Sequence, residues 1–434
     1  MDFSRGREQG ERLQHVVPGG AHTYAKGSDQ YPENAPGVLV RGSGCHVWDL
    51  DGNEFIEYGM GLRSVTLGHA YPPVVEAVRE SLSLGTNFTR PAAIELQCAE
   101  RFLEIIEGAD MLKFTKDGST ANTAALRLAR AFTGRDMVAL CAEHPFFSYD
   151  DWFFCTTTMD GGIPKVNDEL SVRFKYNDAP SLAALFEAHP GKIAAVFLEP
   201  ARADEPTKDF LHEVQRLCQQ NGAVLVLDEM ITGFRWHLQG AQKLYGVVPD
   251  LSTFGKAVAN GFSLSVLCGK RDIMRLGSRE RPQDNVFLLS TTHGAEIHSL
   301  AAAIRTMEIY QSEPVIEHLY RQGERLRTGF NQAVRHHHLE GYVEVVGRPC
   351  NLLYASRDPD HRPSQAFRSL FLQETIRRGV LMPSLVVSYS HTDADIDRTI
   401  DAIDGALAVY ARAFQDGVEM HLVGRPSRTV LDRR

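Results

Sequence analysis

The chain has 434 residues, of which 43% are hydrophobic and 23% charged, a composition typical of a globular protein. Its formal net charge of −9 argues against a nucleic-acid-binding protein, which needs a basic surface to neutralise phosphates. No apolar run of about 18 residues and no signal-peptide pattern occurs, so we expect no membrane association. The 7 scattered cysteines, without a CxxC motif, predict free thiols and a cytoplasmic protein.

Three consecutive histidines, His336, His337 and His338, raise the question of a metal site. Adjacent side chains on a helix point in different directions, so they cannot all face one ion. A metal site is also built from ligands that converge on a single point. On this argument the sequence predicts no bound metal.

The hydrophobic pattern divides the chain into three segments. Residues 1–90 combine many glycines with short polar–apolar alternations, which predicts a small sheet and then a helix over 72–84. In residues 91–300, short apolar runs alternate with helical stretches, as in the βαβ units of a mostly parallel sheet. Residues 301–434 form a third segment. Toward the C-terminus we expect helices over 295–338, 364–378 and 394–415, with short strands near 341–355 and 380–382.

Two fully apolar runs end in a carboxylate. Residues 194–198 are followed by Glu199, and residues 223–227 by Asp228. Such runs are typical of strands buried on both faces, and open α/β folds bind ligands at the carboxyl ends of these strands. For either residue alone, a solvated acid in a turn is an equally compatible interpretation.

A small-residue turn at Gly118 and Ser119 follows a predicted strand over 111–114 and opens a predicted helix. Free backbone N–H groups and the positive end of the helix dipole make such a turn a natural phosphate site. The alternative is an ordinary helix cap. The turn alone does not distinguish the two.

Lys256 lies among small and apolar neighbours, after Phe254 and before Asn260. A poorly solvated lysine is more readily neutral and then attacks aldehydes. Pyridoxal chemistry also needs a carboxylate beside the pyridine nitrogen to keep it protonated, a role that Asp228 could fill. Spacing alone leaves a surface lysine and a turn acid as alternatives.

An ordered series of motifs resembles the class III aminotransferases, and within them the glutamate-1-semialdehyde 2,1-aminomutase branch. The series covers nearly the whole chain, which makes the resemblance specific. Its core is the run from Leu227 to Arg235, followed by Phe254, Gly255 and Lys256. The other matching segments are 18–20, 48–52, 67–69, 127–130, 198–200, 246–251 and 391–392.

The resemblance implies an α/β protein of fold type I, dependent on pyridoxal 5'-phosphate. It implies a large domain with a mixed, mostly parallel sheet over 91–300, and a small α+β domain built from both termini, 1–90 and 301–434. Lys256 would hold the cofactor as a Schiff base, Asp228 would pair with the ring nitrogen, and Met230 would pack against one face of the ring.

The resemblance also implies a phosphate site and a shared active site. Gly118 and Ser119 lie where the family binds the phosphate, and Phe146 lies where an aromatic side chain stacks on the ring. Thr292 lies where the neighbouring subunit contributes a phosphate contact. We therefore expect a homodimer with shared active sites.

The chain departs from the aminomutase pattern at several positions. Asp117 replaces the serine of the phosphate turn, and we expect its carboxylate to point away from the phosphate. Lys26 replaces an arginine that binds the substrate carboxylate, and lysine cannot form the bidentate fork. The aminomutase also has a gating glutamate, and its nearest counterpart in this chain is Val387. With Lys26, the candidates for substrate binding are Arg63 and Glu199.

These departures favour an aminotransferase acting on a carbonyl compound other than glutamate semialdehyde. It would move an amino group in ping-pong fashion from a small-molecule donor to an acceptor such as a sugar or a phosphorylated aldehyde. The alternative is an intramolecular aminomutase. A non-catalytic scaffold, a hypothesis of another class, conflicts with the presence of both Lys256 and Asp228. The sequence leaves donor, acceptor and stereochemistry undetermined.

Overall fold

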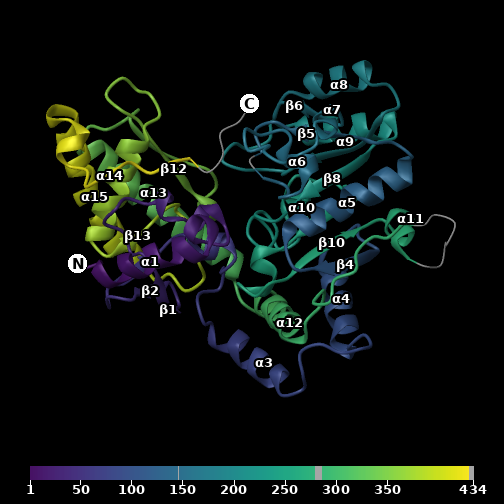
Figure 1. Ribbon diagram of the computed structural model, residues 1–434, viewed down its shortest axis with the longest axis horizontal. Helices are drawn as coiled ribbons and strands as arrows, with labels where there is room; N and C mark the ends of the chain where they lie inside the picture. Colours follow the sequence, from purple (N-terminus) through teal and green to yellow (C-terminus); the bar gives the residue numbers. More distant parts are fainter. Residues whose placement is uncertain (145, 279–285, 430–434) are drawn as a thin grey trace. The chain divides into compact units, whose positions relative to one another are not determined.

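The computed structural model describes residues 1–144, 146–278 and 286–429, which form two compact units (Figure 1). Unit 1 comprises Met1–Tyr71 and the described residues that follow Ile316. Unit 2 comprises Pro72–Ile316. The segments 72–90 and 301–316, which the sequence analysis assigned to the small domain, thus belong to unit 2. The reason is packing, because helix α12 (Ile297–Ser312) lies against α3 (Pro72–Leu82) and α4 (Ala93–Ile105).

Unit 2 is built on a seven-stranded sheet of order β4-β10-β9-β8-β7-β5-β6. Strand β10 is antiparallel to β4 and β9, and the pairs from β9 to β6 are parallel. The expected α/β fold with a mixed, mostly parallel sheet is confirmed. The strands are β4 (Met111–Thr115), β5 (Met137–Cys141), β6 (Ser171–Phe174), β7 (Ile193–Leu198), β8 (Val224–Asp228), β9 (Leu251–Phe254) and β10 (Ser265–Gly269).

Helices cover both faces of this sheet, which explains why its central strands are apolar throughout. In β8, Val224 and Val226 join a core with α5 (Gly118–Thr133), whereas Leu225 and Leu227 join a core with α9 (Phe210–Asn221). Alternate side chains of a strand point to opposite faces, so both sets must be apolar. The other helices are α6 (Asp151–Phe154), α7 (Val166–Glu169), α8 (Ala179–Ala188), α10 (Ala241–Leu244) and α11 (Arg271–Met274).

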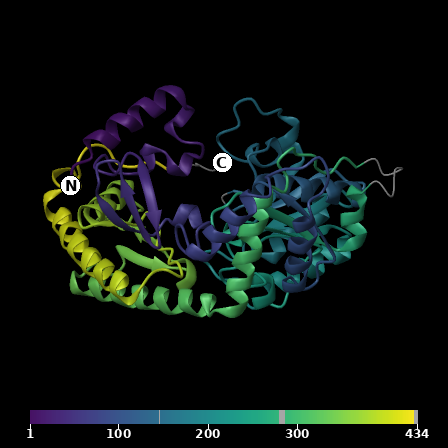
Figure 2. The same cartoon turned by 90° about the horizontal axis from the view of Figure 1, so that it is seen from below.

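Unit 1 contains a four-stranded sheet of order β1-β2-β3-β13 and a separate β11-β12 hairpin. Figure 2 shows α1 on one side of strands β1 to β3, with α13 and α15 on the other. The strands are β1 (Leu39–Ser43), β2 (His46–Asp49), β3 (Glu54–Glu57), β11 (Val343–Val346), β12 (Leu353–Ser356) and β13 (Val380–Leu381). The helices are α1 (Ser4–Val16), α2 (Met60–Arg63), α13 (Val315–His336), α14 (Gln365–Arg377) and α15 (Asp393–Asp416). Within the described ranges, no helix is long and apolar enough to cross a membrane.

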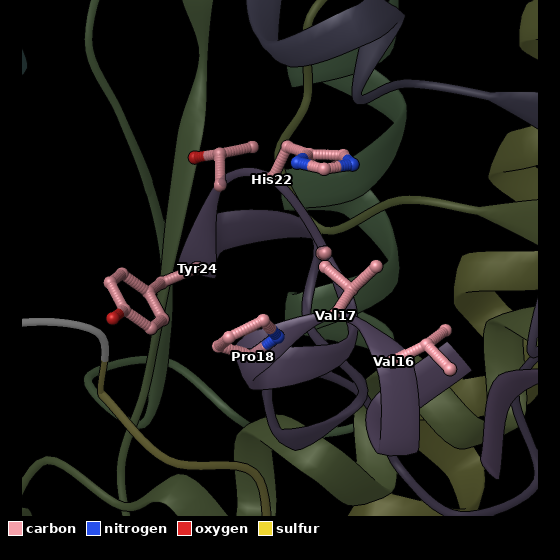
Figure 3. Close-up of a pocket in the computed structure, with 7 residues that line it drawn as sticks. Val16, Val17, Pro18, His22 and Tyr24 are labelled. Atoms are coloured by element: carbon pink, nitrogen blue, oxygen red, sulfur yellow. The ribbon is translucent and has the colours of Figure 1, made fainter. Parts of the chain in front are cut away.

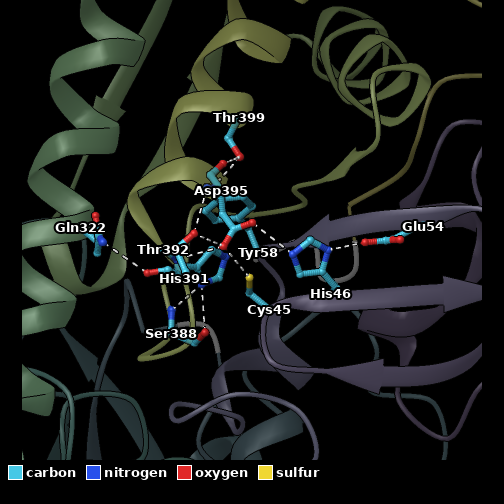
Figure 4. Close-up of polar contacts among 10 residues, drawn as sticks. All are labelled: Cys45, His46, Glu54, Tyr58, Gln322, Ser388, His391, Thr392, Asp395 and Thr399. Carbon is cyan, nitrogen blue, oxygen red and sulfur yellow. Dashed lines mark hydrogen bonds and ion pairs between the residues drawn. The ribbon is translucent and has the colours of Figure 1, made fainter.

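A polar cluster joins the N-terminal strands of unit 1 to the start of α15 (Figure 4). The His46 imidazole lies between two carboxylates, with Nδ1 2.7 Å from Glu54 Oε1 and Nε2 3.1 Å from Asp395 Oδ1. Asp395 also caps its own helix by accepting from the Thr392 N–H at 2.9 Å. The hydrogen bond to Asp395 is the main cause that raises the pKa of His46 above its ordinary value of 6.5.

We expect His46 to stabilise unit 1 more at acidic than at alkaline pH. Because folding raises its pKa, its contribution is fully present below the unfolded value and is lost as the pH rises through the folded value. At low pH the free energy of unfolding of wild type should exceed that of His46→Gln by about 1 kcal/mol or less, as expected for a partly exposed pair. At high pH the difference should be smaller.

Thermal unfolding of both proteins at pH 6 and pH 9 measures this difference. The exposed His15 of α1 provides a control for the loss of one histidine, because His15→Gln leaves the bonds of His46 to Glu54 and Asp395 in place. A margin for His46 that grows with pH would contradict the prediction.

Candidate active site

Asp228 is the last residue of β8, and the sheet places its carboxylate in a buried polar network. Its Oδ2 accepts from Asn122 Nδ2 at 2.7 Å, and its Oδ1 accepts from the Met230 N–H at 2.9 Å. Asn122 is itself oriented by Thr253, whose Oγ1 donates to Asn122 Oδ1 at 2.7 Å. Burial raises the pKa of Asp228, and the positive charge of Lys256 is the largest opposing cause.

Lys256 follows the neighbouring strand β9 and begins the short 3-10 helix η4 (Lys256–Ala259). Its φ of 47° lies in the left-handed region that non-glycine residues rarely adopt. Backbone strain of this kind persists only where the surroundings enforce it, and it concentrates at functional sites. Asp228 ends β8 and Lys256 follows β9, and these two strands are parallel neighbours. The two residues, 28 positions apart in the sequence, thus lie at the same end of the sheet.

Met230 lies in a narrow space bordered by two glycines. A Cβ added to Gly118 would lie 2.9 Å from Met230 Sδ, and one added to Gly255 would lie 2.6 Å from the same atom. Neither distance is possible for a real side chain, so both positions require glycine as long as Met230 stays in place. The thioether is thus held between the start of α5 and the residue before Lys256.

Asp117 is the N-cap residue of α5. Its carboxylate caps the helix by accepting from the Thr120 N–H at 2.8 Å, so it stays at the helix N-terminus. Aspartate is a preferred N-cap residue, because its side chain accepts from a free N–H of the first turn. Ser119 is buried, and its Oγ accepts from the Tyr149 N–H at 3.2 Å. Lys116 pairs with Glu296 at 2.6 Å.

Two further predicted cofactor residues lie in more open surroundings. Phe146 is 44% exposed, and its ring packs edge-on against Phe153 and Phe154 at centroid distances of 5.9 and 6.0 Å. Thr292 is exposed, and its carbonyl oxygen accepts from Asn87 Nδ2 at 2.9 Å. It lines an open hollow of ≈ 550 Å³ in unit 2.

The three candidate substrate residues lie in different environments. Glu199 of unit 2 is buried, and its backbone N–H donates to His144 Nδ1 at 2.8 Å. In unit 1, Arg63 has a φ of 72° and its Nε donates to Asn351 Oδ1 at 2.8 Å. Lys26 is exposed at the end of the short helix Tyr24–Lys26.

The segment before Lys26 borders a shallow pocket of ≈ 340 Å³ within unit 1 (Figure 3). Lys26 is not one of its lining residues. The pocket combines an apolar wall with hydroxyl and imidazole groups. Its lining residues are Val16, Val17, Pro18, Ala21, His22, Thr23 and Tyr24.

Asn122 and Thr253 are site residues that the sequence analysis missed. Asn122 is 1% exposed on the face of α5 that otherwise carries Ala125, Leu126 and Ala129. A polar residue on an apolar helix face, one turn after a predicted phosphate turn, was the available signal. It predicts a buried polar partner but does not say which one.

Comparison with known proteins identifies the family. The model of the class-III aminotransferase family matches residues 28–407. The chain belongs to this family. It is 32% identical to a glutamate-1-semialdehyde 2,1-aminomutase of Dechloromonas aromatica, over 93% of this chain and 99% of that protein.

Solved structures support the same assignment. The pyridoxal-phosphate form of the FumI protein of Sphingopyxis sp. MTA144 superposes with a TM-score of 0.86 at 29% identity, over 95% of this chain and 98% of that one. A glutamate-1-semialdehyde-aminomutase from Pseudomonas aeruginosa PAO1, at 18% identity, has the same fold with a TM-score of 0.82, over 94% of this chain and 95% of that one. The chain is thus a fold type I enzyme that uses pyridoxal phosphate, as the sequence motifs predicted.

The residues of unit 2 fit this cofactor. A protonated pyridine nitrogen requires a buried carboxylate that stays ionised, and Asp228 accepts two hydrogen bonds that favour its charged form. The two glycines around Met230 leave no side chain that would fill the space beside its thioether. Lys256 would provide the amine that binds the cofactor.

Proposed function

We propose that this protein is an aminotransferase in which Lys256 and Asp228 carry the chemistry. The observation that supports this most directly is the Asp228 network, in which Asn122 and the Met230 N–H hold a buried carboxylate close to the charge of Lys256. A scaffold protein would have no need for a buried, oriented carboxylate, which is costly to desolvate.

Pyridoxal phosphate supplies an aldehyde that takes up the amino group and a ring that withdraws electrons from the substrate. Asp228 keeps a proton on the ring nitrogen, because its ionised carboxylate is held in a fixed orientation. Lys256 Nζ removes the α-proton of the amino donor and later returns a proton to the acceptor carbon. Met230 restricts one side of the site through its contacts with Gly118 and Gly255.

For the phosphate we propose the first turn of α5, with Gly118 and Ser119 as its residues. The backbone N–H groups and the dipole of a 16-residue helix favour an anion there. Asp117 adds a negative charge at the same helix end and takes up the Thr120 N–H. The helix end alone therefore binds the phosphate less strongly, and residues outside α5 must contribute. Thr292 of the partner subunit is our candidate for such a phosphate contact.

A second copy of the chain is the proposed partner, which would make the active sites shared. Large apolar side chains around the Thr292 hollow are exposed, as expected for a surface that another subunit covers. They are Phe88 at 53% and Leu96 at 63%.

Mixing two inactive variants tests this arrangement. We expect Lys256→Ala and Thr292→Ala each to be impaired alone, and a mixture that has exchanged subunits to regain activity. A mixed dimer contains one site with native Lys256 from one chain and native Thr292 from the other. Amino transfer after subunit exchange is the measurement. Dimers that exchange without any gain would contradict the shared site.

The acceptor is proposed to be a carbonyl compound other than glutamate semialdehyde, such as a sugar or a phosphorylated aldehyde. Two replacements support this. Lys26 stands in place of the arginine that binds the substrate carboxylate, and the buried, apolar Val387 lies near the position of the gating glutamate. An intramolecular aminomutase stands as a second candidate, because curated relatives at 29% to 32% identity carry that name.

An amino-donor experiment separates these two functions. A transferase incubated with one α-amino acid and no acceptor should convert its cofactor to the pyridoxamine form, with an equal amount of keto acid. Chromatography of the released cofactor and keto acid quantifies both products across a panel of donors. Product formation from glutamate semialdehyde at an undiminished rate without any donor would overturn the transferase assignment.

A reducing compartment, the cytoplasm, is the proposed location. All 7 cysteines are free and buried in the structure. Burial is the largest cause that raises the pKa of Cys98 to about 12, so this thiol stays protonated and unreactive. Thiols preserved in this form are typical of intracellular proteins.

A further inference from the structure

The consecutive histidines lie at the C-terminal end of helix α13. The helix ends at His336, and His338 has a φ of 55°, in the left-handed region. His337 is the first residue after the helix, and its N–H still donates to the Ala333 carbonyl oxygen at 3.1 Å. The expectation that the three histidines cannot all face one ion leaves room for two of them, and His336 and His337 are that pair.

Both side chains converge on one carboxylate of helix α15. His336 Nδ1 and His337 Nε2 each lie 3.0 Å from the same oxygen, Asp404 Oδ1. The two imidazole rings are 4.5 Å apart between centroids. The three ligand atoms lie within 4.8 Å of one another, close enough to surround a single ion.

We propose that His336, His337 and Asp404 bind a divalent transition-metal ion, with Zn²⁺ as the probe. Imidazole nitrogens suit zinc, copper and nickel, and one carboxylate completes a three-ligand set that leaves a position open to water. The side chain of His336 is 71% exposed and that of Asp404 43%, so an ion reaches the site from solvent.

The site joins two helices of unit 1 that are distant in the sequence. His336 ends α13, and Asp404 lies in the middle of α15. An ion held by both helices stabilises the folded form, because unfolding separates the ligands. The proposed consequence is a metal-dependent gain in the stability of unit 1 that does not involve catalysis.

The cluster of Cys45, His46 and Asp395 is the rival location for an ion. There the carboxylate is already occupied, because Asp395 Oδ2 accepts from both the N–H and the hydroxyl of Thr392 at 2.9 and 2.7 Å. Binding a metal would break the cap of α15. Asp404 carries no comparable capping bonds among the hydrogen bonds of the described residues, which favours the exposed site.

Calorimetric titration of the tag-free holoenzyme with Zn²⁺ tests the proposal. We expect one strong site per chain in wild type, weakened in His337→Gln and in Asp404→Asn. The loss should exceed the roughly 10- to 100-fold effect of removing an outer-shell partner. His338→Gln and Cys45→Ser are the controls, and both should bind as wild type does. Turnover should be unchanged in all four variants.

Thermal unfolding with and without Zn²⁺ gives a second measurement. Wild type should gain thermal stability with the ion, whereas His337→Gln and Asp404→Asn should fold normally and gain none. Binding that is lost only in Cys45→Ser would overturn the proposal in favour of the buried cluster. Equal Zn²⁺ binding by wild type, His337→Gln and Asp404→Asn would show that the binding is unspecific, and this too would overturn the proposal.

Discussion

Lys256→Ala should lower kcat/KM for amino transfer by about 10²- to 10⁴-fold or more, the range that a positioned general base contributes. The expected loss is at the upper end, because Lys256 both anchors the cofactor and moves the proton. The variant should also lose covalent attachment of the cofactor. Borohydride reduction followed by peptide mass spectrometry measures this directly, since only wild type should carry the modified Lys256 peptide.

Lys243→Ala is the matched control. Lys243 lies in the same unit but forms a surface ion pair with Glu107 at 2.6 Å. Its loss should leave attachment and turnover near those of wild type. A labelled peptide that contains another lysine, or a Lys256→Ala protein with normal turnover, would refute the proposed role of Lys256.

Asp228→Asn should reduce turnover by about 10²- to 10³-fold, as when one preorganised electrostatic group is removed from an active site. Asparagine retains the shape but cannot hold a proton on the ring nitrogen by charge. The cofactor should still attach to Lys256, so attachment and turnover separate in this variant. Together with the Lys256 variant, this result would assign two different roles to the two residues.

Asn122→Ala should reveal how Asp228 is kept ionised. The Asn122 hydrogen bond lowers the pKa of Asp228, against the effect of burial. Without it the pKa of Asp228 rises further, so the acidic limb of the pH–activity profile should move to higher pH. A uniform fall in activity with no movement of that limb would indicate that Asn122 has only a structural role. Asn221→Ala, at the C-terminal end of α9 and not one of the residues of the Asp228 network, is a suitable control.

Some features of the fold could be predicted because one local pattern determines them. Strands β7 and β8 were expected within one residue of their observed bounds, since only a strand covered on both faces needs a fully apolar run. The expected helical stretch over 295–338 is present. It is two helices, α12 and α13, separated at Glu313 and Pro314, because proline cannot continue a helix from the preceding turn.

Other features depend on which segments pack together. The polar side chain of Asn122 on an apolar helix face was visible in the sequence, but its bond to Asp228 depends on how α5 packs over the sheet. Charge repulsion predicted that the Asp117 carboxylate points away from the phosphate, and the structure adds its bond to the Thr120 N–H, which the sequence analysis did not include. His336 and His337 converge on Asp404 only because α13 ends beside α15.

The sequence by itself determined the family, the cofactor and the mostly parallel sheet, since these follow from ordered motifs and apolar runs within short stretches of chain. Only the tertiary structure decided the partners of Asp228 and the convergence of the two histidines. The physical reason is that a hydrogen bond acts over about 3 Å. Which groups come that close is set by the packing of segments far apart in the chain.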